Sequence, residues 1–184
     1  MDNKKYAILV VDMLNDFVTG ALKCDRGLAI VPKTAELLRE ARKHDVPVIF
    51  CNDAHLPNID HECKKEFWGP HAIAGTKGAE VIPDLELCDK DYVVPKRRYS
   101  GFFHTDLDLL LRELGVDTVI MTGLHAHMCV RHTAADAFQL GYTVVVAKDA
   151  TDSFTEEDYN MGIEYFKNTY FAEITDVDTL VKRF

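Results

Sequence analysis

Short runs of hydrophobic residues alternate along the chain with stretches in which hydrophobic residues recur at helical spacing. The short runs are rich in β-branched residues and contain few polar positions, which is typical of strands buried on both faces of a sheet. They span residues 6–11, 46–51, 92–94, 116–122 and 142–147, with a weaker candidate at 170–174. We predict strands over these ranges.

Four stretches between the runs have the pattern of amphipathic helices. They cover residues 34–44, 107–114, 134–140 and 156–167. Gly141 follows the third stretch as a typical helix stop, and the fourth begins with acidic residues, which suit a helix N-terminus. Strands that alternate with helices predict an α/β fold, in which helices cover both faces of a parallel sheet.

No repeat or Pro/Gly/Ser-rich linker divides the chain, so we expect one domain over residues 1–184. Residues 52–83 form a long, irregular connection, and such connections usually contribute to function. In open parallel sheets, ligands bind beyond the carboxyl ends of the strands. We therefore expect catalytic and ligand-binding residues at the carboxyl ends of the predicted strands.

Charged and nucleophilic side chains follow three of the predicted strands. Asp12 comes directly after the first run, and Lys96 lies at the exit of a strand that Pro95 keeps extended. Cys129 lies in a glycine-containing turn that leads into a helix. A thiol at a helix N-terminus near a lysine is expected to have a lowered pKa and to act as a nucleophile. We predict that these three residues form a catalytic group.

Each of the three also has a simpler interpretation. Asp12 is also explained as a turn aspartate, since Asp is common at turns and helix starts. Most lysines only solvate a surface, and a buried structural thiol is the default for Cys129. It is the convergence of three strand ends that favours catalysis.

A second group of polar residues lies in and beside the long connection. Asp53 and His55 are two residues apart, so in an extended chain both point the same way, and His71 adds a third ligand. Two histidines and a carboxylate suit Zn²⁺, Fe²⁺ or Mn²⁺ with coordination positions left for substrate or water. The alternative is a polar loop whose histidines only form hydrogen bonds.

Aromatic residues flank these motifs and are candidates for the wall of a substrate pocket. They are Phe17, Trp68, Tyr99, Phe102 and Phe103. Three histidines, His125, His127 and His132, surround Cys129. One of them is a candidate for orienting substrate, and their individual roles stay open.

Charge and cysteine content narrow the class of partner. The formal net charge of −9 disfavours nucleic acid, and the cluster Lys96-Arg97-Arg98 is too short for a nucleic-acid track. No hydrophobic run is long enough to span a bilayer. Five cysteines without a CxxC pair indicate free thiols in a reducing compartment. We expect a cytoplasmic protein whose partner is a small molecule.

The ordered motifs resemble the isochorismatase-like cysteine hydrolases, and within them the nicotinamidase and N-carbamoylsarcosine amidase branch. The matching segments are Asp12 with Asn15-Asp16-Phe17, Asp53-x-His55, Gly69-Pro70-His71 with Gly75-Thr76-x-Gly78-Ala79-Glu80, Lys96-x-x-Tyr99-Ser100-Gly101-Phe102, and Gly123 to Thr133 with Cys129. The resemblance extends over nearly the whole chain. It implies a three-layer α/β/α fold with a doubly wound, mostly parallel sheet of about six strands.

The resemblance also implies a reaction. Cys129 attacks an amide carbonyl, Asp12 accepts the thiol proton and Lys96 stabilises charge. The backbone N–H groups of Cys129 and His125 hold the oxyanion, with a cis peptide bond between Leu124 and His125. Ammonia leaves, and water hydrolyses the thioester.

The family metal site implies that Asp53, His55 and His71 hold a divalent cation, with zinc expected first and iron or manganese as alternatives. In nicotinamidase-like members this cation binds the pyridine nitrogen. Some family members supply a further carboxylate ligand from the intervening loop. Glu62 and Glu66 are the candidates here, and the spacing leaves open whether either of them binds. The family also implies a homo-oligomer, either a dimer or a tetramer.

The expected activity is hydrolysis of nicotinamide to nicotinate and ammonia. One alternative is an amidase for N-carbamoylsarcosine or another carbamoyl or ureido compound, and an alternative of another class is a non-catalytic, metabolite-binding family member. The segment His125-Ala126-His127-Met128 differs from the Ala-Thr-Asp-Tyr that is typical of nicotinamidases. That departure keeps the identity of the amide open.

Overall fold

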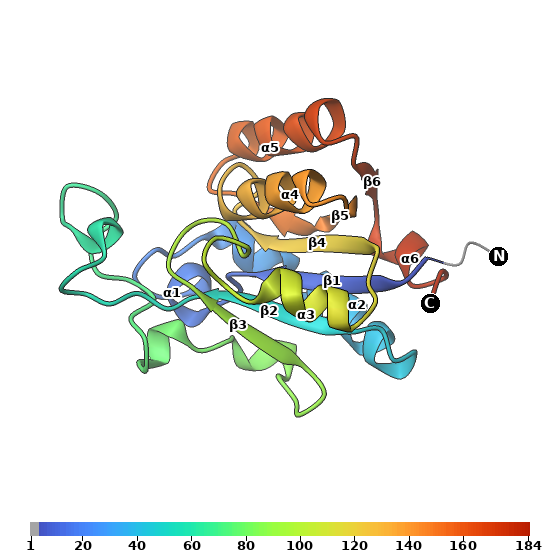
Figure 1. Ribbon diagram of the computed structural model, residues 1–184. Coiled ribbons are helices and arrows are strands. Elements are labelled where there is room, and N and C mark those ends of the chain that lie inside the picture. The colour runs from blue at the N-terminus through green and yellow to red at the C-terminus, as the bar shows by residue number, and fades with distance from the viewer. Residues whose placement is uncertain (1–3) are drawn as a thin grey trace.

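The computed structural model describes residues 4–184 and contains a parallel sheet between two layers of helices (Figure 1). The strands are β1 (Tyr6–Val11), β2 (Val48–Asp53), β3 (Tyr92–Lys96), β4 (Thr118–Leu124), β5 (Thr143–Asp152) and β6 (Glu173–Thr175). The helices are α1 (Asn15–Val18), α2 (Asp25–Lys43), α3 (Leu107–Glu113), α4 (Cys129–Gln139), α5 (Glu156–Thr169) and α6 (Val177–Leu180). Across the described residues the strand order is β3-β2-β1-β4-β5-β6, and every pairing is parallel. The predicted α/β fold is confirmed.

Several boundaries differ from those that the sequence pattern predicts. Strand β2 begins after Pro47 and ends at Asp53, two residues later than predicted, so that Asp53 is the last residue of the strand. Helix α2 starts at Asp25, nine positions before the predicted start at Thr34, and contains Pro32.

A proline inside a helix, such as Pro32 in α2, costs about 3 kcal/mol. The burial of Ile30 and Val31 against the sheet offsets that cost.

The sheet separates two hydrophobic cores, because successive residues of a strand point to opposite faces. Ile8 and Val10 of β1 belong to one core, and Ala7, Leu9 and Val11 belong to the other. Helices α2 and α6 cover the first face, whereas α3, α4 and α5 cover the second (Figure 1). Strand β1 is therefore buried on both sides, which explains its uninterrupted hydrophobic sequence.

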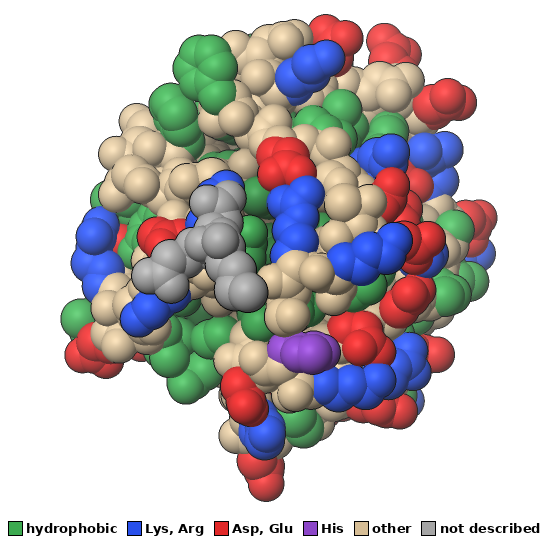
Figure 2. Space-filling view, turned by 90° about the vertical axis from the view of Figure 1, so that its right-hand side faces the viewer, with side chains coloured by type: hydrophobic (Ala, Val, Ile, Leu, Met, Phe, Trp, Pro, Cys, Tyr) green, Lys and Arg blue, Asp and Glu red, His purple; other side chains and the backbone are tan. Residues whose placement is uncertain are grey.

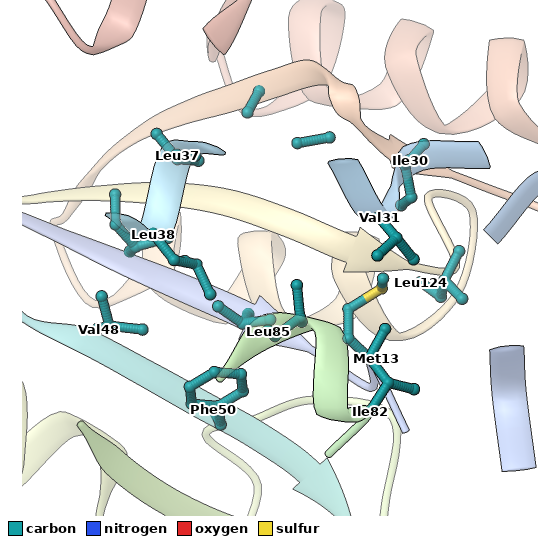
Figure 3. Packing of buried hydrophobic residues seen from close by; sticks show 14 of the residues in the cluster. Met13, Ile30, Val31, Leu37, Leu38, Val48, Phe50, Ile82, Leu85 and Leu124 are labelled. Atoms are coloured by element: carbon teal, nitrogen blue, oxygen red, sulfur yellow. The ribbon is translucent and has the colours of Figure 1, made fainter. Parts of the chain in front are cut away.

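The first core is filled by side chains from α2 and the central strands (Figure 3). Leu37 and Leu38 of α2 lie over the sheet, with Leu38 on the side of Val48 and Phe50 of β2, and all four are at most 2% exposed. Burying such a side chain contributes about 1.5–3 kcal/mol. This packing fixes the strands whose ends form the site.

The strand order reverses direction between β1 and β4, which creates a topological switch point at their carboxyl ends. Gly123, near the end of β4, has a φ of +103°, and an added Cβ would lie 2.1 Å from the carbonyl oxygen of Val11. Only glycine allows this close approach. The ends of the two central strands are thereby held side by side.

The long connection after β2 contains three short 3₁₀ helices, at His61–Cys63, Lys77–Ala79 and Pro83–Leu85. Helix α1, which the sequence analysis does not predict, anchors part of this connection. Asn15 donates through its side chain to the carbonyl oxygens of Lys77 and Glu80, at 2.8 and 3.2 Å. Within residues 4–184, no helix is long and apolar enough to cross a membrane.

Candidate active site

Asp12 occupies the first position beyond β1 and adopts a φ of +54°, a left-handed conformation that Asp tolerates better than most residues. Its carboxylate is fully buried. One oxygen accepts the backbone N–H of Asp53 at 2.8 Å, and the other lies 2.7 Å from Nζ of Lys96. The end of β1 is therefore joined to the ends of β2 and β3.

Lys96 lies between two buried carboxylates, with its Nζ 2.7 Å from Asp12 and 2.6 Å from Asp53. Burial alone would lower the pKa of Lys96, but the two carboxylates hold it well above its ordinary value. For Asp53, burial opposes ionisation, yet Lys96 and His55 keep the pKa of the carboxyl below its usual value. The ammonium is thus charged, and the group carries one excess negative charge.

Cys129 is the first residue of α4 and is 5% exposed. Its Sγ and single oxygens of Asp12 and Asp53 lie within 4.8 Å of one another. The structure therefore brings the three predicted catalytic residues, from three separate strand ends, into one group.

The predicted direction of the thiol pKa is wrong. Burial raises the pKa of Cys129 well above its ordinary value, the attraction of Lys96 opposes this, and the carboxylates of Asp12 and Asp53 add to the rise. Burial also raises the pKa of Asp12, to about 6, with Asp53 adding to the rise and Lys96 opposing it. The resting thiol is consequently neutral, and it faces a carboxylate suited to accept its proton.

The turn between β4 and α4 places backbone donors beside the thiol. The peptide bond between Leu124 and His125 is cis, in agreement with the resemblance. The N–H of Cys129 lies in the first turn of α4, where backbone N–H groups have no partner within the helix. Such donors are available to a developing oxyanion.

Asp53, His55 and His71 form a buried cluster whose ligand atoms lie within 4.8 Å of one another. Among the residues that the structure describes, neither ring nitrogen of the buried His55 has a hydrogen-bond partner. His71 uses Nδ1 in a 2.8 Å contact with the carbonyl oxygen of Gly69, which leaves Nε2 for a ligand. Unpaired imidazole nitrogens beside a carboxylate fit a divalent cation of the zinc type.

A second layer of side chains orients this cluster. Asp60 lies 3.5 Å from Nδ1 of His55, and Arg97, whose Nε is 3.0 Å from Asp60, holds the pKa of that carboxyl well below its usual value. Asp16 accepts the N–H of Ala72 at 2.8 Å and so fixes the segment that contains His71. Neither the role of Asp60 nor that of Asp16 could be recognised in the sequence, because their partners come close only in the fold.

Of the two candidates for a further carboxylate ligand, Glu62 is buried on the wall of the pocket, and burial raises its pKa. Glu66 is exposed. Glu62 is not part of the three-residue cluster, although it lines the same pocket as Asp53 and His71.

A pocket opens beside the thiol. Its lining residues are Phe17, Leu22, Asp53, Glu62, Trp68, His71, Tyr99, His125, Met128, Cys129 and Phe154. Three of the five aromatic candidates, Phe17, Trp68 and Tyr99, line this pocket, and Nε1 of Trp68 donates to the hydroxyl of Tyr99 at 3.1 Å. Leu22 and Phe154 are additions, because they come from segments without a recognisable pattern. Of the three histidines near Cys129, His125 lines the pocket. Phe102 instead packs near Tyr142, and Phe103 is 52% exposed.

The other two histidines near Cys129 do not line this pocket. His127 contacts the hydroxyl of Ser153 through Nδ1 at 3.0 Å. His132 contacts the carbonyl oxygen of Met128 at 2.8 Å, and its ring packs against Tyr99. Hydrogen bonds within the protein therefore explain the positions of both side chains.

Known proteins share this fold and much of this sequence. N-carbamoylsarcosine amidase from Thermoplasma acidophilum is 38% identical, with a TM-score of 0.87 over 95% of this chain and 97% of that chain. Pyrazinamidase of Pyrococcus horikoshii, solved in complex with zinc, is 32% identical, with a TM-score of 0.85 over 94% of this chain and 99% of that chain. A relative in Arabidopsis thaliana, named a probable inactive nicotinamidase, is 35% identical over 88% of each chain.

The family model described as the isochorismatase domain matches residues 6–179. That range includes all six strands of the sheet and every residue of the site. The chain therefore belongs to the isochorismatase family of hydrolases.

Proposed function

We propose that the protein is a cysteine amidase that hydrolyses a small, uncharged aromatic amide, with nicotinamide as the first candidate. The observation that supports this most directly is the composition of the pocket beside Cys129. Phe17, Trp68, Tyr99 and Phe154 supply aromatic walls. A planar ring with a carboxamide substituent matches a small pocket of this kind.

The charge of the pocket favours an uncharged substrate. Among the described residues that line it, the ionisable groups include the carboxylates of Asp53 and Glu62, and none is Lys or Arg. Lys96 is buried and does not line this pocket, and two carboxylates already bind it. N-carbamoylsarcosine carries a carboxylate at neutral pH and would find no cationic side chain here, so that only a cation held by Asp53, His55 and His71 could pair with it. Nicotinamide carries no charge and needs no such partner.

In the first half of the reaction, Asp12 takes the proton of the Cys129 thiol as the sulfur adds to the amide carbonyl carbon. The carbonyl oxygen becomes an oxyanion, to which the backbone N–H groups of His125 and Cys129 donate. Asp12 then passes the proton to the amide nitrogen, the C–N bond breaks and ammonia leaves. Lys96 keeps Asp12 oriented and balances its charge.

In the second half, water enters and attacks the thioester carbonyl. Asp12 accepts a proton from that water and returns it to the sulfur as the C–S bond breaks. The products are the free acid and the neutral thiol, so one water is consumed for each amide hydrolysed.

Asp53, His55 and His71 are the residues that would hold a divalent cation, with zinc as the first candidate. The excess negative charge of Asp12 and Asp53 over Lys96 favours a cation at this place. When bound there, the cation supplies a Lewis acid that holds an electron-rich atom of the substrate.

The test is ammonia release from nicotinamide and from N-carbamoylsarcosine by zinc-loaded protein, repeated after chelation. We expect release from nicotinamide that falls on chelation and is lost in Cys129→Ala. Cys88→Ala removes an exposed thiol and serves as the matched control with unchanged activity. The absence of release from nicotinamide by zinc-loaded protein would contradict the proposal.

The second candidate is a carbamoyl or ureido amidase, which is favoured by the 38% identity to an N-carbamoylsarcosine amidase. Release from N-carbamoylsarcosine alone would establish it in place of the first. Release from neither compound, together with unchanged binding of nicotinamide by Cys129→Ala, would favour a non-catalytic, metabolite-binding member.

A further inference from the structure

The side chain of His125 is a polar group that the proposed reaction does not use. Only its backbone N–H takes part in that reaction. The imidazole lines the pocket beside Cys129 and is 3% exposed. Both of its ring nitrogens are buried without a hydrogen-bond partner among the described residues. Buried polar atoms are nearly always paired, so two unpaired nitrogens on a pocket wall indicate that a ligand pairs with them.

The ring is held in one orientation by aromatic neighbours. It stacks on Phe154 with ring centroids 3.8 Å apart and an interplanar angle of 23°, and it meets Phe17 edge to face at 6.1 Å. Phe154 thus covers one face of the ring, and the imidazole forms part of the pocket wall while both of its nitrogens stay unpaired among the described residues. The imidazole therefore presents hydrogen-bonding atoms from a fixed position, as a specificity group requires.

The chemistry of the ring restricts what it can bind. Burial lowers the pKa of His125 to about 3, and the neighbouring His127 adds to this effect, so the imidazole is neutral at physiological pH. A neutral imidazole offers one donor and one acceptor and brings no positive charge. It therefore suits an uncharged polar atom, such as a ring nitrogen or a hydroxyl group, better than a carboxylate.

We infer that the imidazole of His125 determines substrate specificity by hydrogen bonding to a second polar atom on the ring of the substrate. The preferred substrate is then an aromatic amide that carries a further ring nitrogen or hydroxyl group in addition to the single ring nitrogen of nicotinamide. This inference rests on the proposed function. It adds a preference that nicotinamide does not satisfy, since its single ring nitrogen would be bound by the cation that Asp53, His55 and His71 would hold.

The experiment compares KM and kcat for nicotinamide, pyrazinamide, 5-hydroxynicotinamide and 6-hydroxynicotinamide, using the zinc-loaded protein. We expect at least one of the last three to have a KM about tenfold below that of nicotinamide, which corresponds to one good hydrogen bond. In His125→Phe, which keeps the stack on Phe154, this preference should disappear, so that the KM values of the four amides converge.

Two further variants separate binding from structure. His125→Asn retains a donor and an acceptor and should keep part of the preference. His127→Phe removes a neighbouring imidazole that does not line the pocket and should keep all of it. The thermal midpoint of His125→Phe should equal or exceed that of the unsubstituted protein, because two unpaired buried nitrogens are removed.

The outcomes distinguish the two proposals. Hydrolysis of nicotinamide without preference for any of the other three amides, or a preference that survives in His125→Phe, would overturn the role of His125 and leave the proposed function standing. A lower thermal midpoint with all four KM values raised equally would show that the ring is only a packing residue. Hydrolysis of none of the four amides would overturn the proposed function and this inference together.

Discussion

At the scale of single residues, the site depends on one lysine placed between two carboxylates. Asp12, Asp53 and Lys96 are all at most 1% exposed, so their charges are compensated mainly by one another. The excess of one negative charge also distinguishes this group from a simple ion pair. It explains how one cluster can hold both a proton acceptor and a carboxylate ligand for a cation.

Replacing Lys96 with Met should destabilise the protein strongly, because two adjacent carboxylates would stay buried without a cation. Removal of one partner from a buried ion pair costs about 3–5 kcal/mol, and we expect the free energy of unfolding in urea to fall by this amount when chelator is present. Lys33→Met removes an exposed partner of Asp178 and is the matched control. If the free energy of unfolding falls no further in Lys96→Met than in Lys33→Met, Lys96 does not compensate the charges of the buried carboxylates.

The identity of the site residues could be predicted from the sequence, but their protonation could not. Asp12, Lys96 and Cys129 follow recognisable strands, so their convergence follows from the rule for parallel sheets. The pKa of the thiol depends on how deeply Cys129 is buried and on its distance from two carboxylates. Neither quantity is visible in a pattern of residues, and the expected lowering of the pKa was therefore wrong.

At the scale of elements, the strands were predicted more closely than the helices. Uninterrupted β-branched runs identify β1 and β4 because both faces of these strands are covered. The early start of α2 escaped prediction because Pro32 resembles a boundary, whereas tertiary packing carries the helix through it. The pocket wall formed by Leu22 and Phe154 also escaped, since these residues meet only after the helices pack on the sheet.

The contact between α3 and the start of β5 predicts how stability depends on alkaline pH. The hydroxyl of Tyr142 donates to the carboxylate of Asp108 at 2.8 Å. Burial, together with this bond, raises the pKa of Tyr142 to about 12, against about 10 in the unfolded chain. Between pH 10 and 12 the folded state therefore binds more protons than the unfolded chain. The contribution of Tyr142 to the free energy of unfolding is complete below pH 10 and should decline as the pH rises toward 12.

The measurement is urea denaturation across this alkaline range for the unsubstituted protein and for Tyr142→Phe. We expect the variant to be less stable by about 1 kcal/mol near neutral pH, because one hydrogen bond is lost. The difference between the two proteins should shrink as the pH rises from 10 to 12. A difference that stays constant or grows over this range would contradict the assignment.

At the scale of the whole molecule, the two ends of the sheet differ in character. Figure 2 shows the side at the amino ends of the strands, where acidic and basic side chains of the described residues are intermixed. The opposite end carries the pocket and the segment 54–70, which extends away from the sheet at the left of Figure 1. A mixed surface with net charge −9 agrees with a small-molecule partner.

The segment 54–70 exposes hydrophobic side chains, with Ile59 at 69% and Phe67 at 60% exposure. Exposed apolar surface of this kind marks interaction sites, and we expect it to contact a second copy of the chain. Light scattering should give the mass of an oligomer, which Ile59→Glu combined with Phe67→Glu should reduce. Phe171→Glu, which alters a still more exposed residue on another segment, should leave the mass unchanged. The mass of a single chain for the unsubstituted protein would contradict this expectation.

The central claim is that the sulfur of Cys129 forms a bond to the acyl group of an uncharged aromatic amide. The most direct measurement is the mass of peptides from zinc-loaded protein that has been mixed with nicotinamide and quenched in acid during turnover. The account predicts one added nicotinoyl group on the peptide that contains Cys129, and none in Asp12→Asn. Ammonia release without any acyl group on this peptide, or with the acyl group on another cysteine, would contradict it.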